Sequence, residues 1–356
     1  MADLFRRSIE IITSNQSPSG AYIACPNFPT YAYCWFRDGA FIAYAMDLAG
    51  EHASARRFHD WAARAINRRQ GLVADALAAA ASGASLGNED ILHTRYTLEG
   101  EEASGEAWPN FQLDGFGTWL WALRQHLLCT GQEPPAAWLE AAGLVAAYLA
   151  ALWQRPCFDC WEEFPDRVHS HTLAAIYAGL QAHAAIAGAN HQQVLESIRT
   201  LLVDSSAEGG YFIKLMGSPS VDASLIGLST PYQVVAPEHP AMEATIARIE
   251  RALAAGGGVH RYATDTYYGG GEWVLLAGWL GWHYAESGRP ERARAFLDWM
   301  ESQADETGCL PEQTPTHLID PEYYEPWLKR WGPVARPLLW SHAMYIILSQ
   351  KLDAFS

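Results

Sequence analysis

The 356-residue sequence predicts an all-α fold, in which an inner ring of helices closes into a toroid and is wrapped by an outer ring. Segments that are apolar on nearly every face alternate along the chain with amphipathic segments, as expected where buried helices alternate with surface helices. Nearly half of the residues (49%) are hydrophobic and 15 are Trp, which is enough material for a large core. A helical solenoid is the alternative, but no fixed-period repeat supports it.

The first pair of segments shows this alternation. Residues 38–49 (DGAFIAYAMDLA) are apolar on most faces, so they should form a buried helix. The next segment has its apolar residues on one helical face and should lie outside the first helix. Those residues follow the spacing i, i+3, i+4, i+7 and i+8, and they are Phe58, Trp61, Ala62, Ala65 and Ile66.

The same pairing returns late in the chain. Residues 272–287 are hydrophobic throughout, and an amphipathic helix should begin at Pro290, because Pro is favoured in the first helical turn. Further helices are expected at 3–14, 114–128, 136–153, 170–187, 190–203, 239–253 and 336–352. The connections are expected at 15–37, 70–112, 154–169, 205–237, 254–271 and 305–335, with short extended pieces such as 210–214. No linker rich in Pro, Gly or Ser divides the chain, so one domain is expected over 1–356.

Charge and composition exclude several classes of partner. The formal net charge is −16 and no Lys/Arg cluster is present, which argues against nucleic acid and anionic membrane surfaces. The N-terminus does not resemble a secretory signal, and no apolar run approaches the roughly 20 residues of a membrane span. The six cysteines are scattered at low density, so we expect a reduced, cytoplasmic protein.

Two motifs that could bind a metal have simpler explanations. Cys157 and Cys160 form a C-x-x-C motif, but no second Cys/His pair lies at zinc spacing, so packing beside a loop is the simpler interpretation. His169 and His171 could contact a metal, but nothing at ligand spacing supports them. We therefore expect no metal site and no cofactor.

The expected loops share a composition that suits a sugar. Aromatic rings cover the apolar face of a sugar, while carboxylates and Arg bind its hydroxyl groups. Taken singly, each loop is explained more simply by a buried Trp beside a salt bridge. The loop segments are YAYCWFRDGA at 31–40, AWPNFQLDGFG at 107–117, FDCWEEF at 158–164, HRYATDTYYGGGEW at 260–273 and CLPEQT at 309–314.

Three carboxylates lie within five positions, at Asp159, Glu162 and Glu163. Crowding or partial burial raises the pKa of a carboxyl group, so one of the three could stay protonated near neutral pH and act as a general acid. From these residues alone, a solvated acidic turn is the simpler interpretation. Glu312 lies far away in the sequence, in a Pro-flanked loop, and could be an exposed residue just as easily.

Taken in order, these loops resemble glycoside hydrolase family 15, the family of glucoamylases, glucodextranases and some bacterial trehalases. The resemblance runs from about residue 17 to about residue 345 and rests on the combination of motifs. The motifs are W-x-R-D, W-x-x-x-Q-x-D-G, W-E-E, R-Y-x-x-D-x-Y-Y and E-Q, followed by L-W-S-H at 339–342. The family implies an (α/α)6 barrel, in agreement with the alternating helices.

The resemblance also implies a role for each matched residue. Glu162, the first Glu of W-E-E, would be the general acid, and Glu312 would be the general base. Asp159 and Glu163 would assist substrate binding and tune the pKa of the acid. The residues implied in sugar binding are Trp35, Arg37, Asp38, Trp108, Asp114, Asp159, Trp161, Glu163, Arg261 and Tyr267. Gln112, Gly115, Tyr262, Asp265, Tyr268 and Gln313 complete the motifs.

The implied reaction is hydrolysis by a single displacement. The acid protonates the leaving oxygen while the base activates a water on the opposite face of the ring, which requires two carboxyl groups roughly 6.5–9.5 Å apart. The product would be β-glucose, released from the non-reducing end of an α-glucoside without a metal or organic cofactor.

The short N-terminal stretch bears on the substrate. Prokaryotic members usually carry an N-terminal β-sandwich domain, but here the W-x-R-D motif begins at Trp35, so neither that domain nor a starch-binding module is expected. A compact barrel favours a short oligosaccharide, isomaltose or an isomalto-oligosaccharide, over granular starch. An α-1,4-linked oligosaccharide is the other option. The expected partner is thus a small oligosaccharide, and the sequence does not define an oligomeric state.

Three other functions stay open at this point. A catalytically silent sugar-binding or regulatory barrel is one, because fold does not fix function, although the presence of both Glu162 and Glu312 argues against it. An inverting glycoside phosphorylase is another, although a carboxylate at 312 would repel phosphate. The third is a trehalase, since the linkage depends on the shape of the pocket beyond the scissile bond.

Overall fold

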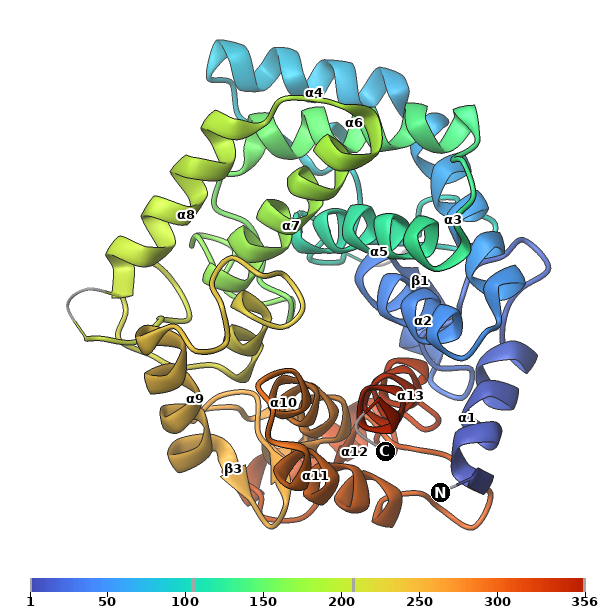
Figure 1. Cartoon of the computed structure of the whole chain (residues 1–356), viewed down its shortest axis with the longest axis vertical. Coiled ribbons are helices and arrows are strands. Elements are labelled where there is room, and N and C mark those ends of the chain that lie inside the picture. The colour runs from blue at the N-terminus through green and yellow to red at the C-terminus, as the bar shows by residue number, and fades with distance from the viewer. Residues whose placement is uncertain (1, 104–106, 207–208, 355–356) are drawn as a thin grey trace.

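The computed structural model describes residues 2–103, 107–206 and 209–354, which form two concentric layers of helices (Figure 1). Five α-helices of the inner layer surround the axis of the ring. They are α2 (Phe36–Leu48), α5 (Asp114–Thr130), α7 (Ser170–Ala187), α10 (Val274–Glu286) and α13 (Leu339–Asp353). The sixth position is taken by a 3₁₀ helix, η3 (Ala223–Leu228), which contacts both α7 and α10.

The inner layer closes on itself because α13 packs against α2. Outer helices cover it, as the pairs α1·α13, α2·α3, α6·α7, α7·α8, α9·η3 and α10·α11 are in contact. The outer helices are α1 (Ala2–Ser14), α3 (His52–Asn67), α6 (Ala136–Leu152), α8 (Gln192–Ser206), α9 (Pro240–Leu253) and α11 (Pro290–Ser302). The predicted (α/α)6 barrel is therefore confirmed.

Burial explains the two kinds of helix. An inner helix touches neighbours on both sides and an outer helix behind it, so nearly its whole circumference must be apolar. In α10 every residue from Val274 to Ala285 is buried. In its outer partner α11, the buried positions are Ala293, Leu297 and Met300, which lie on one helical face.

Glycine allows two inner helices to pack closely. A Cβ atom at Gly117 of α5 would lie 2.3 Å from the carbonyl oxygen of Ala175 in α7. A Cβ atom at Gly179 of α7 would lie 2.7 Å from the Cα atom of Gly117. Both distances are shorter than a carbon contact allows, so this helix crossing depends on the two glycines.

Two of the expected loops contain α-helices and another contains a six-residue 3₁₀ helix, so those predictions were wrong. The 70–112 stretch contains α4 (Gln70–Ser82), an Ala-rich helix with little apolar periodicity, in which Ala itself supplies the helix propensity. The 305–335 stretch contains α12 (Tyr324–Trp331), whose aromatic residues pack against the 3₁₀ helix η4 (Tyr267–Gly269). The 205–237 stretch contains η3, and 3₁₀ turns have a period close to three that the helical template does not detect.

Short antiparallel strand pairs tie the loops together at the ends of the inner helices. Strand β1 (Cys34–Trp35) pairs with β2 (Arg95–Tyr96), and β5 (Glu272–Trp273) pairs with β6 (Gln313–Thr314). A third pair joins β3 (Ala254–Ala255) to β4 (Gly258–Val259). The extended piece expected at 210–214 was wrong, because the ladder there is a single bridge between Leu215 and His169. Among the described residues, none of the helices combines the length and apolarity that a membrane crossing requires.

Candidate active site

A pocket of about 340 Å³ opens where the loops gather at the N-terminal ends of α2, α10 and α13. Strand β1 leads directly into α2, and β5 leads directly into α10, so both strands deliver side chains to the pocket rim. Most of the site residues predicted from the sequence meet here. They are Trp35, Arg37, Asp38, Trp108, Trp161, Glu162, Glu163, Arg261, Tyr267 and Glu312.

Glu162 stands on a tight turn whose backbone is strained. Its φ angle is 69°, a left-handed conformation that is uncommon for a residue with a Cβ atom and that concentrates at functional sites. The turn is held from below by Asp159, whose Oδ1 accepts hydrogen bonds from the backbone N–H groups of Trp161 and Glu163, each at 2.9 Å. Asp159 is buried beneath the pocket, so it shapes the turn that presents Glu162.

The carboxylate of Glu162 is positioned by three N–H donors. Its Oε1 accepts from the indoles of Trp35 at 2.7 Å and Trp108 at 3.1 Å, and from the side-chain amide of Gln112 at 3.1 Å. The amide orientation of Gln112 is fixed in turn, because its Oε1 accepts from Arg37 at 2.9 Å. Gln112 was named in a motif but not as a site residue, and it connects the Arg37 network to Glu162.

Arg37 and Asp38 form the floor on the α2 side. Arg37 donates to Asp114 at 3.1 Å, and its Nε lies 3.6 Å from Asp38. Burial raises the pKa of Asp38 to about 7, and the Arg37 charge opposes that rise. Asp114 is fully buried and lies behind Arg37, so the structure places it as a support for a pocket residue and not on the pocket surface.

Glu312 lies in the loop that precedes β6. Its backbone N–H donates to Ala335 and its carbonyl accepts from Val274, the first residue of α10, so the loop is fixed on both sides. The side chain is 3% exposed, and burial raises the pKa of its carboxyl group to about 8. The Tyr31 hydroxyl and the Arg261 charge oppose this rise.

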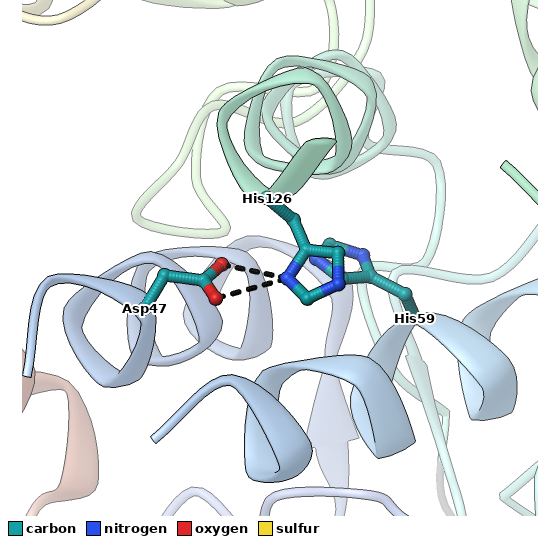
Figure 2. Close-up of side chains that lie close together, drawn as sticks. All are labelled: Asp47, His59 and His126. Carbon is teal, nitrogen blue, oxygen red and sulfur yellow. Dashed lines mark hydrogen bonds and ion pairs between the residues drawn. The ribbon is translucent and has the colours of Figure 1, made fainter. Parts of the chain in front are cut away.

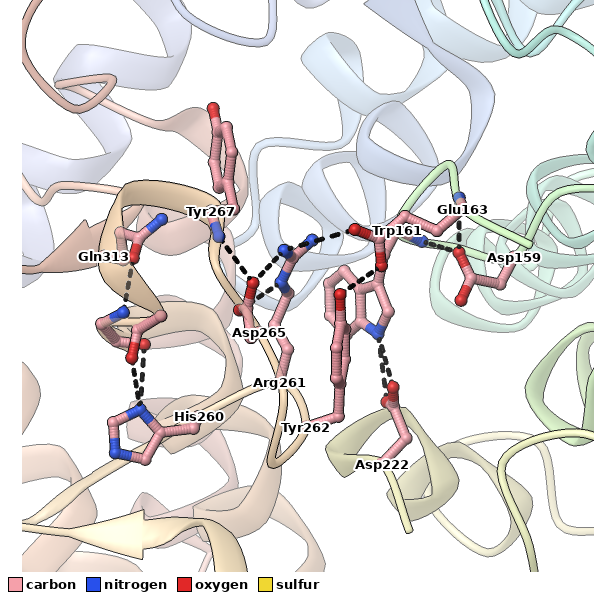
Figure 3. Close-up of polar contacts among 12 residues, drawn as sticks. Asp159, Trp161, Glu163, Asp222, His260, Arg261, Tyr262, Asp265, Tyr267 and Gln313 are labelled. Carbon is pink, nitrogen blue, oxygen red and sulfur yellow. Dashed lines mark hydrogen bonds and ion pairs between the residues drawn. The ribbon is translucent and has the colours of Figure 1, made fainter. Parts of the chain in front are cut away.

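Arg261 and Glu163 form a charged network on the third side of the pocket (Figure 3). Arg261 donates to both oxygens of Asp265, at 2.7 and 2.5 Å, and its Nη2 lies 3.8 Å from Glu163. The Tyr262 hydroxyl donates to Glu163 at 2.6 Å. Burial raises the pKa of Glu163, while Arg261 and Tyr262 oppose the rise. Of the three crowded carboxylates in the sequence, Glu163 therefore has a raised pKa, and the cause is burial.

Trp161 is held against Arg261 by buried charges (Figure 3). Its indole N–H donates to both oxygens of Asp222 at 3.0 Å. Lys214 lies between Asp222, at 2.8 Å, and Asp159, at 3.3 Å. This pairing lowers the pKa of Asp222 and raises that of Lys214, although burial alone would shift each group the other way. Lys214 and Asp222 belong to no predicted motif, so no pattern of residues indicated this support.

Several pocket residues were not predicted, and most are aromatic. The Tyr31 hydroxyl lies 2.9 Å from that of Tyr267, beside Glu312. Aromatic density in the YAYCWFRDGA and L-W-S-H segments was the available signal for Tyr31 and Trp340. The amphipathic spacing of Trp327 and Trp331 would have required α12 to be recognised. The unpredicted aromatic residues that line the pocket are Tyr31, Trp273, Trp327, Trp331 and Trp340.

The cysteine and histidine motifs pack inside the protein. Cys157 and Cys160 are buried free thiols whose pKa values are raised by burial. His169 Nε2 lies 3.0 Å from the carbonyl oxygens of Cys157 and Phe164, and His171 Nδ1 lies 3.0 Å from that of Ser224. These contacts are typical of buried packing residues.

Comparisons with known proteins show which family and which solved structures this chain is similar to. The model of the family described as glycosyl hydrolases family 15 matches residues 2–298. An isomaltose glucohydrolase of Kribbella flavida is 42% identical over 98% of this chain and 92% of its own length. A solved glycosidase variant in complex with glucose superposes with a TM-score of 0.94 at 41% identity, covering 99% of this chain and 96% of that chain. A bacterial glucoamylase complexed with acarbose has a TM-score of 0.75 at 21% identity, covering 98% and 55%, which is a likeness of fold alone.

Proposed function

The chain belongs to glycoside hydrolase family 15 and is therefore an inverting, exo-acting glucosidase, and on that premise we propose that it hydrolyses isomaltose and short isomalto-oligosaccharides. In this proposal Glu162 is the general acid and Glu312 is the general base. The product is β-glucose from the non-reducing end. The barrel acts as a single catalytic domain.

One observation supports the catalytic pair above all others: Glu162 and Glu312 line the same pocket from loops 150 residues apart. Glu312 lies outside the matched residues 2–298, so its role rests on the geometry of the pocket. The three donors to Glu162 converge on Oε1, so we assign proton transfer to Oε2. Glu312 would take a proton from the water that attacks the opposite face of the sugar, as inversion requires.

The pocket lining supports a glucosyl ligand. Trp35 and Trp108 stack edge to face at 5.9 Å, and Trp161 and Trp273 lie 5.6 Å apart. Aromatic walls of this kind cover the apolar face of a sugar. Arg37 and Asp38 supply a donor and an acceptor for its hydroxyl groups.

The size of the pocket and the similar proteins support a short substrate. The volume of about 340 Å³ is at the lower end of the roughly 300–1,000 Å³ typical of small-molecule sites, so one or two sugar units fit better than a polymer. The relative that is 42% identical is an isomaltose glucohydrolase, and for this reason we favour the α-1,6 linkage.

The charge balance weighs against a phosphorylase. A phosphate nucleophile would need unpaired cations close to the base. Both arginines that line the pocket are paired, Arg37 with Asp114 and Arg261 with Asp265. Sugar release should accordingly be independent of inorganic phosphate.

The test is release of glucose from maltose, isomaltose, trehalose, panose, starch and dextran, followed by proton NMR to identify the first anomer. We expect β-glucose from isomaltose and, more slowly, from short α-1,6-linked chains. Preference for trehalose or maltose would reject the α-1,6 linkage but would leave the inverting mechanism intact. Initial α-glucose would reject the inverting pair.

We also propose that the protein works in a reducing compartment, the cytoplasm. All six cysteines are free thiols in the structure, which suits a compartment where disulfides are rare. Fractionation of cells that produce the protein at native level, followed by immunoblotting, would test this. Recovery from the medium or periplasm would reject it.

A further inference from the structure

Three side chains that bind metals well meet between the two layers of helices (Figure 2), and none of them lines the pocket. Asp47 comes from α2, His59 from α3 and His126 from α5. The Nδ1 atom of His126 lies 2.9 and 3.0 Å from the two carboxylate oxygens of Asp47. One donor atom from each residue falls within 4.8 Å of the others, and all three residues are buried.

His59 is the member whose environment is incomplete. It is 0% exposed, and neither ring nitrogen has a hydrogen-bond partner among the described residues. A neutral imidazole carries one N–H donor and one acceptor nitrogen, and burial of either without a partner is unfavourable. A bound metal ion would give one of these nitrogens a partner, because neutral imidazole is a common metal ligand.

We propose that Asp47, His59 and His126 bind one divalent transition-metal ion, with zinc preferred. Two imidazoles and a carboxylate form a donor set that suits zinc, whose bonds to these atoms are about 2.0–2.2 Å long. Tetrahedral donors at such bond lengths lie about 3.4 Å apart. The Asp47–His126 contact of 2.9 Å is shorter than this, so it would open slightly as the ion enters, and the three donor atoms already lie within 4.8 Å of one another.

His52, at the edge of the cluster, could supply a fourth ligand. His52 begins α3, and its Nδ1 lies 2.9 Å from Oδ1 of Asp47. Its side chain is 43% exposed, so it can either turn toward the ion or leave that position to water. An opening at His52 also gives the ion a route to an otherwise buried cluster.

The ion would serve as a clamp and would not touch the sugar. Asp47 follows Asp38 by nine residues on α2, a separation of about 13 Å along the helix axis. Its ligands join the neighbouring inner helices α2 and α5 to the outer helix α3 (Figure 1). Asp47 and His126 lie near the C-terminal ends of α2 and α5, whereas the pocket opens at the N-terminal end of α2. This inference does not depend on the proposed function.

The experiment uses the full-length protein, freed of metal with a chelator and then titrated with zinc. We expect one tightly bound zinc ion per chain by calorimetry and by elemental analysis after desalting. Zinc at about 100 times Kd should raise Tm by about 3–4 °C. The variants His59→Leu and His126→Leu should lose both the ion and the rise in Tm, while keeping the turnover of the wild type.

The control is a second histidine pair. His183 Nδ1 lies 2.8 Å from His191 Nε2, so this partly buried pair could also bind zinc. The double variant His183→Asn/His191→Asn should keep the bound ion and the rise in Tm. Loss of the ion in that variant would overturn the proposal, and so would its retention after His59→Leu.

A measurement on the wild type keeps the test decisive if the leucine variants do not fold. X-ray absorption at the zinc edge should show scattering from two imidazoles, or from three if His52 binds, with the remaining donors as oxygen atoms. An ion ligated by sulfur, or no ion retained after desalting, would refute the site.

Discussion

Replacement of Glu312 by Gln should stabilise the protein at neutral pH while it abolishes most of the activity. The side chain is buried, and burial raises the pKa of its carboxyl group from 4.5 to about 8. Between these two values the folded state keeps the proton that the unfolded chain has lost. Stability from this group is therefore fully present below the unfolded pKa and declines as the pH rises toward the folded pKa.

The magnitude follows from the shift. Each pH unit in this interval changes the free energy of unfolding by up to about 1.4 kcal/mol, so the Glu312 carboxyl removes about 2–3 kcal/mol between pH 5 and pH 7. For a chain of this length, about 2.1 cal/mol/K of unfolding entropy per residue converts that loss into about 3 °C in Tm. Gln cannot ionise, so the Glu312→Gln variant lacks this loss.

The assay is differential scanning calorimetry of wild type and Glu312→Gln at pH 5, 6 and 7 and constant ionic strength. The Tm of the variant minus the Tm of the wild type should increase by about 3 °C from pH 5 to pH 7. The turnover number should fall by about 10²- to 10⁴-fold, as expected for loss of a general base. Glu133→Gln, an exposed position, controls for loss of one negative charge.

Two results would refute this reasoning. A difference in Tm that stays constant from pH 5 to pH 7 would mean that Glu312 does not titrate in this range in the folded protein. A relative loss of stability by the variant as the pH rises would mean that the folded state favours the carboxylate, which is the opposite of a raised pKa.

Further predictions concern the acid, the pH profile, the buried charges and the helix crossing. Glu162→Gln should reduce kcat by about 10²- to 10⁴-fold and Glu163→Gln by far less, measured as initial rates; equal losses would contradict our choice of acid. Because the base must be ionised, kcat/KM should fall on the acidic side of its pH profile with a midpoint well above pH 4.5. A value of kcat/KM that stays constant down to pH 5 would contradict a raised pKa at Glu312. Lys214→Met should cost about 3–5 kcal/mol in urea unfolding because it leaves two buried carboxylates unpaired, and the added change Asp222→Asn should restore part of that loss. Gly117→Ala should cost about 1–3 kcal/mol in the same assay, and wild-type stability would show that α5 and α7 can move apart.

Most helices could be predicted because the spacing of their apolar residues reflects which faces are buried. The buried α10 and the one-sided α11 differ in apolar spacing, and that difference follows from the two layers. The pattern failed where packing is not carried by large apolar residues. In α4 only Val73 and Ala76 are buried among its described positions, so an Ala-rich helix looks like a loop.

The site was predictable to the extent that it is carried by contiguous motifs. The W-E-E and W-x-R-D segments contain the residues that meet in the pocket. Spacing could not connect Glu312 to Glu162, because their proximity depends on the closure of the ring. The same holds for Asp47, His59 and His126, which come from three helices and form no sequence motif.

The two carboxylates that we propose as acid and base occupy different environments, and this difference suits an inverting pair. Glu162 is fixed by three N–H donors on one oxygen, so its geometry is set before the substrate arrives. Glu312 is buried beside an aromatic wall, and burial raises its pKa to about 8, close to neutral pH. A base is most effective when its pKa is close to the working pH, because a higher proton affinity strengthens proton transfer while a useful fraction stays ionised. The burial that destabilises the Glu312 carboxylate is thus the same feature that makes it a stronger base.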